Sequence, residues 1–244
     1  MEQRRDSATA YIILADGFET IEALTPLDVL RRCGVEVTTI SLNKTRAVRS
    51  SHGVTVEADA TMEEYMLKRS NAGCSSSAGS TSNAGSSSSA SSTGTSTTGS
   101  RSTTAGNAGT SSSAGSSTTA SSAVRQALIL PGGYPGYKNL CESAEVGALI
   151  TQFHKEGKLL CAICGAPTAL KANQICRGAA ITCHTSVKEE LSDYYSILSS
   201  AVVKYMNIIT GMGAGRSLEF AFAIAESLTS KEKVEEIKAK MEII

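Results

Sequence analysis

Excess charge, long apolar runs and histidine are the features that this sequence has least of. Its 23 basic and 23 acidic residues give a formal net charge of +0, so no charged surface indicates nucleic acid or an acidic membrane as a partner. No apolar run reaches the roughly 18 residues that a membrane span needs. Residues 1–10 are polar and charged, unlike a secretory signal. We therefore expect a cytoplasmic protein with no nucleic-acid and no membrane partner.

The seven cysteines are an odd number and are not spaced as a disulfide framework, so we expect free thiols. Cys161 and Cys164 form a Cys-x-x-Cys pair, which invites a thioredoxin-like redox interpretation. In thioredoxin-like sites the first cysteine is exposed at a helix start, whereas Cys161 falls inside a predicted strand, so one reactive sulfur is favoured. No second pair has the spacing of a zinc site, and the sequence predicts no metal and no cofactor.

One segment, residues 71–122, has almost no large apolar or charged side chains. It consists almost wholly of Ser, Thr, Gly, Ala and Asn, so it has nothing to bury that would offset the entropy of ordering it. We interpret it as a low-complexity flexible insertion within a single α/β domain that spans residues 11–244, after an N-terminal tail of residues 1–10. A glycosylated stalk or a phosphorylation switch is the alternative.

Outside this segment, strand and helix patterns alternate along the chain. Short apolar runs predict strands at residues 11–15, 35–42, 127–130, 158–163 and 179–183. Helical patterns are predicted at residues 20–33, 61–68, 144–155, 167–174, 187–191, 218–228 and 231–240. Hairpins are predicted at residues 46–50 with 54–58 and at residues 202–204 with 207–210. This order is typical of a parallel sheet covered by helices on both faces.

In such a sheet, ligands bind outside the carboxyl ends of the strands. Four chemical features follow predicted strands directly: the acidic segment 16–22, the Pro-Gly-Gly at 131–133, Cys164 and His184. If the strands are parallel, the four features meet at one edge of the sheet. Their convergence predicts an active site there.

Cys164 is the predicted reactive centre. An apolar strand that ends in Cys, followed by two small residues and a Pro that starts a helix, has the shape of a nucleophile elbow. The start of the helix directs free N–H groups and the positive end of its dipole at the sulfur, so we expect a lowered thiol pKa and an accessible thiolate. The alternative is a buried structural cysteine.

Several further groups are candidate partners of this sulfur. The backbone N–H groups of Gly132, Gly133 and Gly165 are predicted to form an oxyanion hole, although an ordinary turn is the alternative for the glycine pair. Glu22 is predicted to hold a carboxyl with a raised pKa beside the thiolate, the alternative being acidic capping of a helix start. His184 is the candidate base on the same edge of the sheet.

Five stretches of the sequence together resemble the ThiJ/PfpI family, and within it the deglycase and glyoxalase III-like branch. They cover essentially the whole chain apart from the tail and the insertion. The stretches are ADGFETIEALTPLDVLRRCGVEV (residues 15–37), LILPGGYPGYKNL (128–140), LLCAICGAPTALKA (159–172), ITCHTSVKEEL (181–191) and GAGRSLEFAFAIAESL (213–228).

The resemblance implies a flavodoxin-like three-layer sandwich, similar to class I glutamine amidotransferases, that forms a homodimer. It assigns the nucleophile to Cys164, a protonated carboxyl partner to Glu22 and a nearby histidine to His184. The backbone on the oxyanion side falls on Gly133 and Gly165. Activities associated with this branch are cofactor-free glyoxalase, which converts methylglyoxal to lactate, deglycation of early glycation adducts, oxidative-stress sensing and chaperoning.

Two positions depart from the family pattern. The peptidase branch has His directly after the nucleophile, where this sequence has Gly165, so a cysteine peptidase is disfavoured. Some relatives have an arginine in the early hairpin, so the residue that recognises a substrate anion stays open between His52, Arg49 and Arg216. The sequence thus predicts an enzyme acting on small dicarbonyls or on glycated proteins and amino acids. A sensor or redox chaperone that oxidises Cys164 is the alternative.

Overall fold

The structure, a computed structural model, describes residues 8–74 and 125–243. Most of the predicted tail and residues 75–122 of the predicted insertion lie outside the described residues. The described elements follow one another in this order: β1 (Thr9–Leu14), α1 (Thr20–Arg32), β2 (Glu36–Ser41), β3 (Ala47–Arg49), β4 (Thr55–Glu57), β5 (Ala60–Thr61), α2 (Met62–Cys74), β6 (Gln126–Leu130), α3 (Gly136–Glu142), α4 (Ala144–Lys155), β7 (Leu159–Ile163), α5 (Pro167–Ala172), β8 (Ala180–Ile181), a 3₁₀ turn (Thr185–Val187), α6 (Lys188–Ser192), β9 (Ser196–Ile197), β10 (Val202–Tyr205), β11 (Ile208–Gly211), a second 3₁₀ turn (Ala214–Arg216), α7 (Ser217–Leu228) and α8 (Lys231–Lys240).

Seven strands form the central sheet, in the order β10-β11-β7-β6-β1-β2-β5. Neighbouring strands are parallel except for β10 and β11, which form an antiparallel hairpin. β3 and β4 form a separate antiparallel hairpin, and β8 and β9 form a separate parallel pair. The mainly parallel sheet predicted from the sequence is confirmed, and so are both predicted hairpins.

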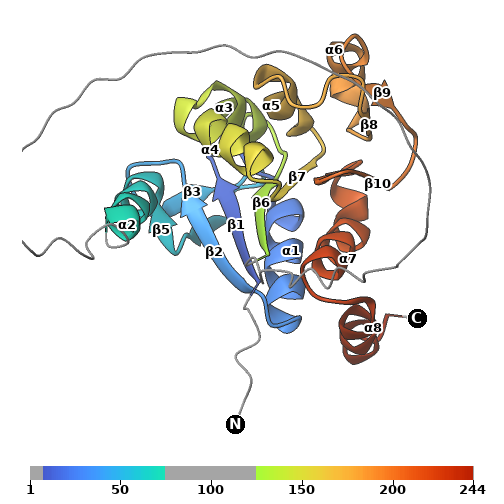
Figure 1. Cartoon of the computed structure of the whole chain (residues 1–244), viewed down its shortest axis with the longest axis horizontal. Coiled ribbons are helices and arrows are strands. Elements are labelled where there is room, and N and C mark those ends of the chain that lie inside the picture. Colours follow the sequence, from blue (N-terminus) through green and yellow to red (C-terminus); the bar gives the residue numbers. More distant parts are fainter. Residues whose placement is uncertain (1–7, 75–124, 244) are drawn as a thin grey trace, which may run out of the picture.

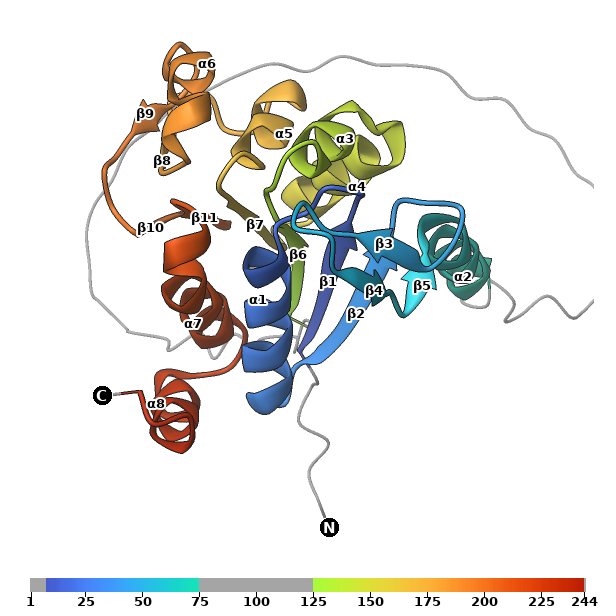
Figure 2. The same cartoon turned by 180° about the vertical axis from the view of Figure 1, so that it is seen from behind.

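Helices cover both faces of the sheet and give three layers (Figure 1). α1 and α7 pack on one face, with α8 against α7, while α3, α4 and α5 pack on the other face (Figure 2). Ile12 and Ile13 are adjacent in β1 and fully buried, yet they belong to the two different cores, because successive side chains of a strand point to opposite faces. Burial on both faces explains the continuous apolar run of β1. The predicted flavodoxin-like α/β sandwich is therefore confirmed.

Two helices differ from the prediction. α2 continues past residue 68 to Cys74, so it includes the first residues of the predicted insertion. α3 lies in a segment for which the sequence predicts no helix, because its seven residues are too few to show a helical period of apolar side chains. Its first turn follows directly from the Gly-Gly turn, since the N–H of Tyr137 donates to the Gly133 carbonyl at 2.9 Å.

The strand predicted at residues 179–183 needs a correction. Only Ala180–Ile181 is a strand, and it pairs with β9 outside the central sheet. The position beside β7 that it could have taken is filled by β11. The premise that His184 follows a strand of the central sheet is therefore wrong, and the role of His184 has to be judged from its own contacts.

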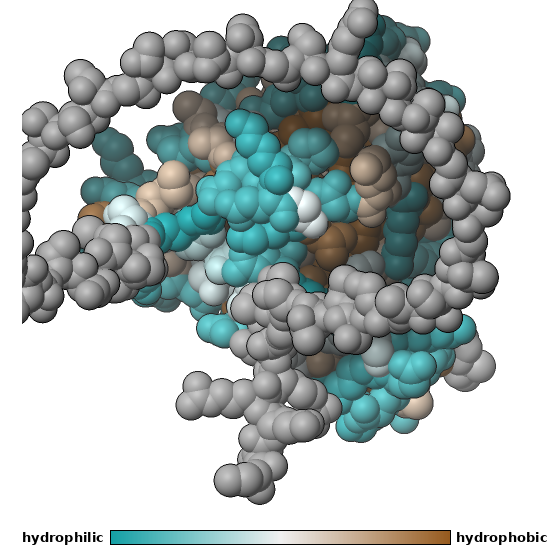
Figure 3. Space-filling view, viewed as in Figure 1, coloured by the Kyte–Doolittle hydropathy of each residue, from teal (hydrophilic) through white to brown (hydrophobic). Residues whose placement is uncertain are grey.

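The described chain resumes after residue 124 on the side of the sheet away from the predicted site. β6 is parallel to β7, so its first residue, Gln126, lies at the edge opposite Cys164. In the view of Figure 3 the described surface is mainly hydrophilic, with hydrophobic residues showing in smaller areas between. Among the helices of residues 8–74 and 125–243, none combines the length and the apolarity that crossing a membrane requires.

The two faces of α7 make a matched test of the packing. Phe220 is fully buried against the sheet, whereas Leu218 on the same helix is 41% exposed. We expect Phe220→Ala to lower the free energy of unfolding by about 3–5 kcal/mol, because a cavity replaces the ring. Leu218→Ala should lower it by less than about 1 kcal/mol. Urea unfolding followed by circular dichroism measures both, and equal losses would contradict this assignment of the core.

Candidate active site

Cys164 occupies a strained turn between β7 and α5. Its φ is +65°, a conformation that residues other than glycine rarely adopt and that costs of order 1–3 kcal/mol. Backbone bonds hold the turn: the Cys164 N–H donates to the Gly211 carbonyl at 3.0 Å, and the Cys164 carbonyl accepts from the His184 N–H at 2.9 Å. Pro167 is the first residue of the helix that follows. The half-buried thiol thus sits on a nucleophile elbow, as the sequence predicted.

Cys161, the other cysteine of the Cys-x-x-Cys pair, lies in the core. It is fully buried in β7, and burial raises the pKa of its thiol. A thiol in this position is inert packing rather than an exposed redox partner. The structure therefore agrees with the interpretation that Cys164 is the reactive sulfur of the two.

The Glu22 carboxyl and the Cys164 thiol both lie next to the backbone of Gly132, which has no side chain between them. The Glu22 side chain comes from the first turn of α1 and is fully buried, and its Oε2 accepts the Gly132 N–H at 2.8 Å. A Cβ added to Gly132 would lie 2.6 Å from Cys164 Cβ, 3.1 Å from its Sγ and 2.7 Å from Glu22 Oε2. Only glycine leaves room for the carboxyl and the thiol to approach this backbone together.

The Glu22 carboxyl is held toward its protonated form. Burial raises the pKa of Glu22 from an ordinary 4.5 to about 7, opposed by the Gly132 hydrogen bond and the Cys164 thiol. Its second oxygen, Oε1, is buried and has no hydrogen-bond partner among residues 8–74 and 125–243. A lone buried carboxylate oxygen is costly, which favours a proton on this group. The raised pKa predicted from the sequence agrees with this environment.

The predicted direction of the Cys164 pKa is wrong. Burial first, and then the charge and contact of the Glu22 carboxylate, raise the pKa of this thiol from 9.0 to about 12, while the backbone N–H groups of Gly133 and Gly165 lower it. The prediction from the helix start omitted both burial and the neighbouring carboxylate. A proton on Glu22 removes that negative charge, so the two groups titrate as a pair and the thiolate is favoured when Glu22 keeps the proton.

The three glycines of the predicted oxyanion hole have separate tasks. The N–H of Gly132 is engaged by Glu22, so its predicted role in binding a substrate oxygen needs correction. The N–H groups of Gly133 and Gly165 lower the pKa of the Cys164 thiol. Gly133 has φ of +89°, and a Cβ there would overlap the backbone of Glu19. Two donors, rather than three, are therefore available to an anion formed at Cys164.

The contact of His184 with Cys164 is a backbone hydrogen bond. Its exposed imidazole accepts the N–H of Ser186 at Nδ1, at 3.2 Å, with the Ser186 Oγ 2.8 Å away. Since Nδ1 is an acceptor, the neutral ring carries its proton on Nε2. A Cβ on Gly213 would lie 3.4 Å from His184 Cδ2. The structure thus places His184 next to Cys164 in space, and its imidazole contacts Ser186 and Gly213.

The three candidates for anion recognition lie in different surroundings. Arg216 pairs with an acidic residue on the first turn of α7, at 3.0 Å. His52 Nδ1 lies 3.3 Å from Glu19 Oε2. Arg49 is held through its backbone, since its N–H donates to Asp16 Oδ1 at 2.8 Å. Among the contacts of the described residues none joins the three, so the structure does not select one of them.

Two residues that were not predicted as site residues help to build the site, Asp16 at the start of the predicted acidic segment 16–22 and Tyr137. Asp16 binds the hairpin to the β1 loop, because its Oδ1 also accepts from Asn43 Nδ2 at 3.0 Å. Tyr137, in the first turn of α3, packs its ring beside Gly165. The sequence signal for Tyr137 was the Tyr-Pro-Gly-Tyr segment after the Gly-Gly turn, but its direction depends on a helix that the pattern did not predict.

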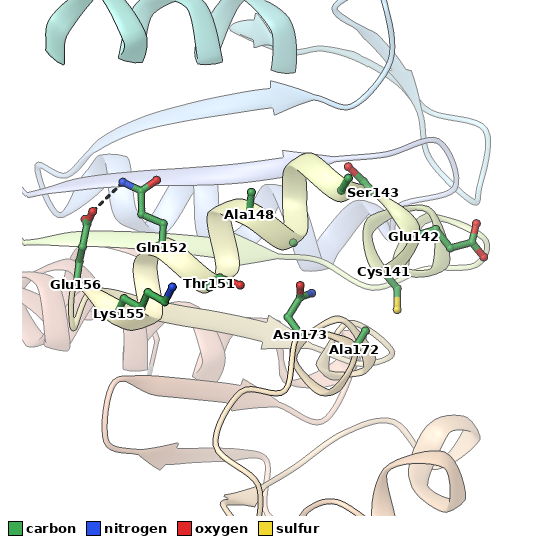
Figure 4. Close-up of a pocket in the computed structure, with 12 residues that line it drawn as sticks. Cys141, Glu142, Ser143, Ala148, Thr151, Gln152, Lys155, Glu156, Ala172 and Asn173 are labelled. Carbon is green, nitrogen blue, oxygen red and sulfur yellow. Dashed lines mark hydrogen bonds between the residues drawn. The ribbon is translucent and has the colours of Figure 1, made fainter. Parts of the chain in front are cut away.

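A separate pocket of about 690 Å³ opens between α4 and α5 (Figure 4). Asn173 and Thr151 line it, Cys141 lies at one end, and a hydrogen bond of 2.7 Å joins Gln152 Nε2 to Glu156 Oε1 there. Neither Cys164 nor its partners line this pocket, so it is not part of the candidate site. Within residues 8–74 and 125–243, no three His, Cys, Asp or Glu side chains gather as a metal site would require.

An elbow cysteine facing a buried carboxyl on a flavodoxin-like sheet defines a known class of α/β proteins, and the chain belongs to the DJ-1/PfpI family, which it matches over residues 8–227. It is 30% identical to Protein dj-1beta of Drosophila melanogaster over 95% of each chain. It is 39% identical to the Caenorhabditis elegans Glutathione-independent glyoxalase DJR-1.2, over 43% of this chain and 56% of that one. The crystal structure of Drosophila melanogaster DJ-1beta matches with a TM-score of 0.72, covering 98% of this chain and 99% of that one.

The contact at Gly132 can be tested by adding one methyl group. Gly132→Ala should lower the free energy of unfolding by about 1–3 kcal/mol, because the new Cβ overlaps Cys164 and Glu22 in a packed site. Gly215→Ala is the matched control, since a Cβ there meets nothing within 4 Å, and it should change stability by less than about 0.5 kcal/mol. Chemical denaturation measures both variants, and a Gly132→Ala protein as stable as the control would refute the geometry.

The pH dependence of stability follows from Glu22. Its folded pKa of about 7 exceeds the ordinary 4.5, so its stabilising contribution is complete below pH 4.5 and is lost as pH rises through about 7. Glu22→Gln should therefore gain stability over the wild type between pH 4.5 and pH 8, by up to about 3 kcal/mol. Urea unfolding at the two pH values measures this. Glu63→Gln, which changes an exposed carboxyl, is the control, and an equal pH response in both variants would contradict the assignment.

Proposed function

We propose that this protein is a cofactor-independent enzyme that uses Cys164 to act on reactive dicarbonyls or their adducts with amines. The reaction we propose is the conversion of methylglyoxal to lactate. The observation that carries the proposal is the approach of a half-buried elbow thiol and a buried, protonatable carboxyl over Gly132. Such a pair supplies a nucleophile and a proton carrier at the same carbonyl group.

In the proposed reaction, Cys164 Sγ adds to the aldehyde carbon of methylglyoxal to give a hemithioacetal. The N–H groups of Gly133 and Gly165 bind the developing oxygen anion. Glu22 and His184 then transfer the proton from this carbon to the neighbouring one, which converts the hemithioacetal to a lactoyl thioester. Water cleaves the thioester, so that methylglyoxal and one water give lactate and the free thiol returns. For a glycated amine, hydrolysis releases the amine and a hydroxy acid.

Two further observations support this proposal. A relative of this chain is named a glutathione-independent glyoxalase. The residue after the nucleophile is Gly165, whose Cβ position is filled by the Tyr137 ring. A histidine cannot occupy that position without displacing the ring, which counts against a peptidase.

Lactate production from methylglyoxal tests the proposal directly. The wild type should form lactate without glutathione, and Cys164→Ser should lose at least about a hundredfold of that rate, because the nucleophile is removed. Cys176→Ser, a change at a half-buried cysteine outside the site, should keep the wild-type rate. An equally active Cys164→Ser protein would overturn the mechanism. Absence of turnover in the wild type would overturn the proposed reaction.

A sensor is the second candidate function, and one contact favours it. The protonatable Glu22 carboxyl beside Cys164 can donate a hydrogen bond to a sulfinate, while Gly133 and Gly165 N–H groups already act on the sulfur. Two equivalents of peroxide would then add two oxygens to Cys164. Peptide mass spectrometry after peroxide treatment detects this addition. Sulfinate at Cys164 in a protein without lactate production would favour the sensor.

A further inference from the structure

The Tyr137 ring takes the place that a side chain on Gly165 would occupy. A Cβ added to Gly165 would lie 2.7 Å from Tyr137 Cγ and Cδ1 and 2.9 Å from Cε1. The ring therefore rests directly on the backbone of the residue that follows the nucleophile. The Gly165 N–H lowers the pKa of the Cys164 thiol. The Tyr137 ring therefore contacts the residue next to the nucleophile, beside the place where a substrate carbonyl would be attacked.

The first turn of α3 fixes this ring to the glycine turn of the site. The Tyr137 N–H donates to the Gly133 carbonyl at 2.9 Å. Tyr137 is therefore hydrogen-bonded to the residue whose own N–H is the other donor to an anion. Both residues whose N–H groups are available to an anion, Gly133 and Gly165, thus contact Tyr137. Burial is the main cause that raises the pKa of Tyr137.

A second aromatic ring extends the wall toward solvent. The Tyr134 ring centroid lies 6.3 Å from that of Tyr137, at an interplanar angle of 57°, within the range of favourable aromatic pairs. Tyr134 is 67% exposed, an unusual exposure for a large ring. The Lys138 ammonium lies 5.3 Å from its centroid, which holds the ring in place by a cation–π contact. The Tyr137 ring thus lies beside the residue that follows the nucleophile, and the Tyr134 ring lies next to it on the solvent side.

We propose that Tyr137, extended by Tyr134, determines the specificity of this site and selects carbonyl substrates that carry a flat aryl group, such as aryl α-oxoaldehydes, over their methyl counterparts. The aryl group, which is on the carbonyl next to the aldehyde that Cys164 attacks, would pack against the Tyr137 ring. Contacts between aromatic rings add to the free energy of burial, whereas a methyl group makes no such contact. The choice of an oxoaldehyde rests on the proposed function, but aryl recognition beside Cys164 rests on the geometry alone.

The test compares two α-bromoketones that alkylate thiols without any turnover, phenacyl bromide and bromoacetone. In both, a bond forms between the Cys164 sulfur and the methylene carbon as bromide leaves. Second-order rate constants at Cys164 are measured by peptide mass spectrometry and divided by those of N-acetylcysteine, which removes the intrinsic reactivity of each reagent. The wild type should prefer phenacyl bromide by about fivefold, equivalent to about 1 kcal/mol.

Three variants identify the source of the preference. Tyr137→Leu should reduce it to about one, while Tyr137→Phe, which keeps the ring and removes the hydroxyl, should keep it. Tyr134→Leu removes the exposed ring and should reduce the preference by about half. A wild type without preference, or a Tyr137→Leu protein that keeps it, would overturn the proposal. So would a Tyr137→Phe protein that loses it, because the hydroxyl would then be responsible.

Turnover separates this proposal from the proposed function. Phenylglyoxal and one water give mandelate, as methylglyoxal and one water give lactate, and the ratio of the two kcat/KM values should fall in Tyr137→Leu by the same factor as the alkylation preference. If neither oxoaldehyde is converted but the alkylation preference follows the variants, the proposed reaction fails and the aryl specificity stands. If both are converted and the ratio is the same in Tyr137→Leu, the specificity proposal fails alone.

Discussion

The hydrogen bond from the Gly132 N–H to Glu22 is the contact on which the rest of the site depends. It joins residues 110 positions apart in the sequence and satisfies one of the two oxygens of a fully buried carboxyl. The other oxygen has no hydrogen-bond partner in the part of the chain that the structure describes, so the carboxyl keeps a strong tendency to hold a proton. Without this proton, Glu22 presents a negative charge to Cys164. With it, Glu22 presents a hydrogen-bond donor. Burial, and then this carboxyl from another element, therefore raise the pKa of the Cys164 thiol against the lowering effect of the Gly133 and Gly165 N–H groups.

The sheet makes this contact possible. β1, β6 and β7 are consecutive in the sheet order and parallel, so their carboxyl ends lie side by side. The loop after β1 leads into the helix that carries Glu22, the loop after β6 carries Gly132, and the turn after β7 carries Cys164. Chain segments remote in sequence thus meet at one edge, where a parallel sheet leaves a crevice. Glycine at position 132 lets them meet without a side chain between them.

Most strands and helices could be predicted from the sequence because short apolar runs and helical periods are local signals. Prediction failed where the decisive contact was tertiary. Ala180–Ile181 has the apolar character of a core strand but pairs with β9, since β11 already lies beside β7. α3 is too short for a period to be visible. For the site, the elbow at Cys164 and its carboxyl partner were predictable, whereas the engagement of the Gly132 N–H and the packing of Tyr137 on Gly165 were not.

The sequence by itself determined a parallel α/β sandwich, a cysteine at the end of a strand and a set of glycines and carboxyls near it. It could do so because each of these depends on the order of a few neighbouring residues. The tertiary structure alone decided the protonation of the pair, which depends on burial and on the distance between groups from separate elements. The pKa of Cys164 shows the difference: the local helix start favours a thiolate, but desolvation and the Glu22 carboxylate raise it to about 12, because long-range burial outweighs a local dipole.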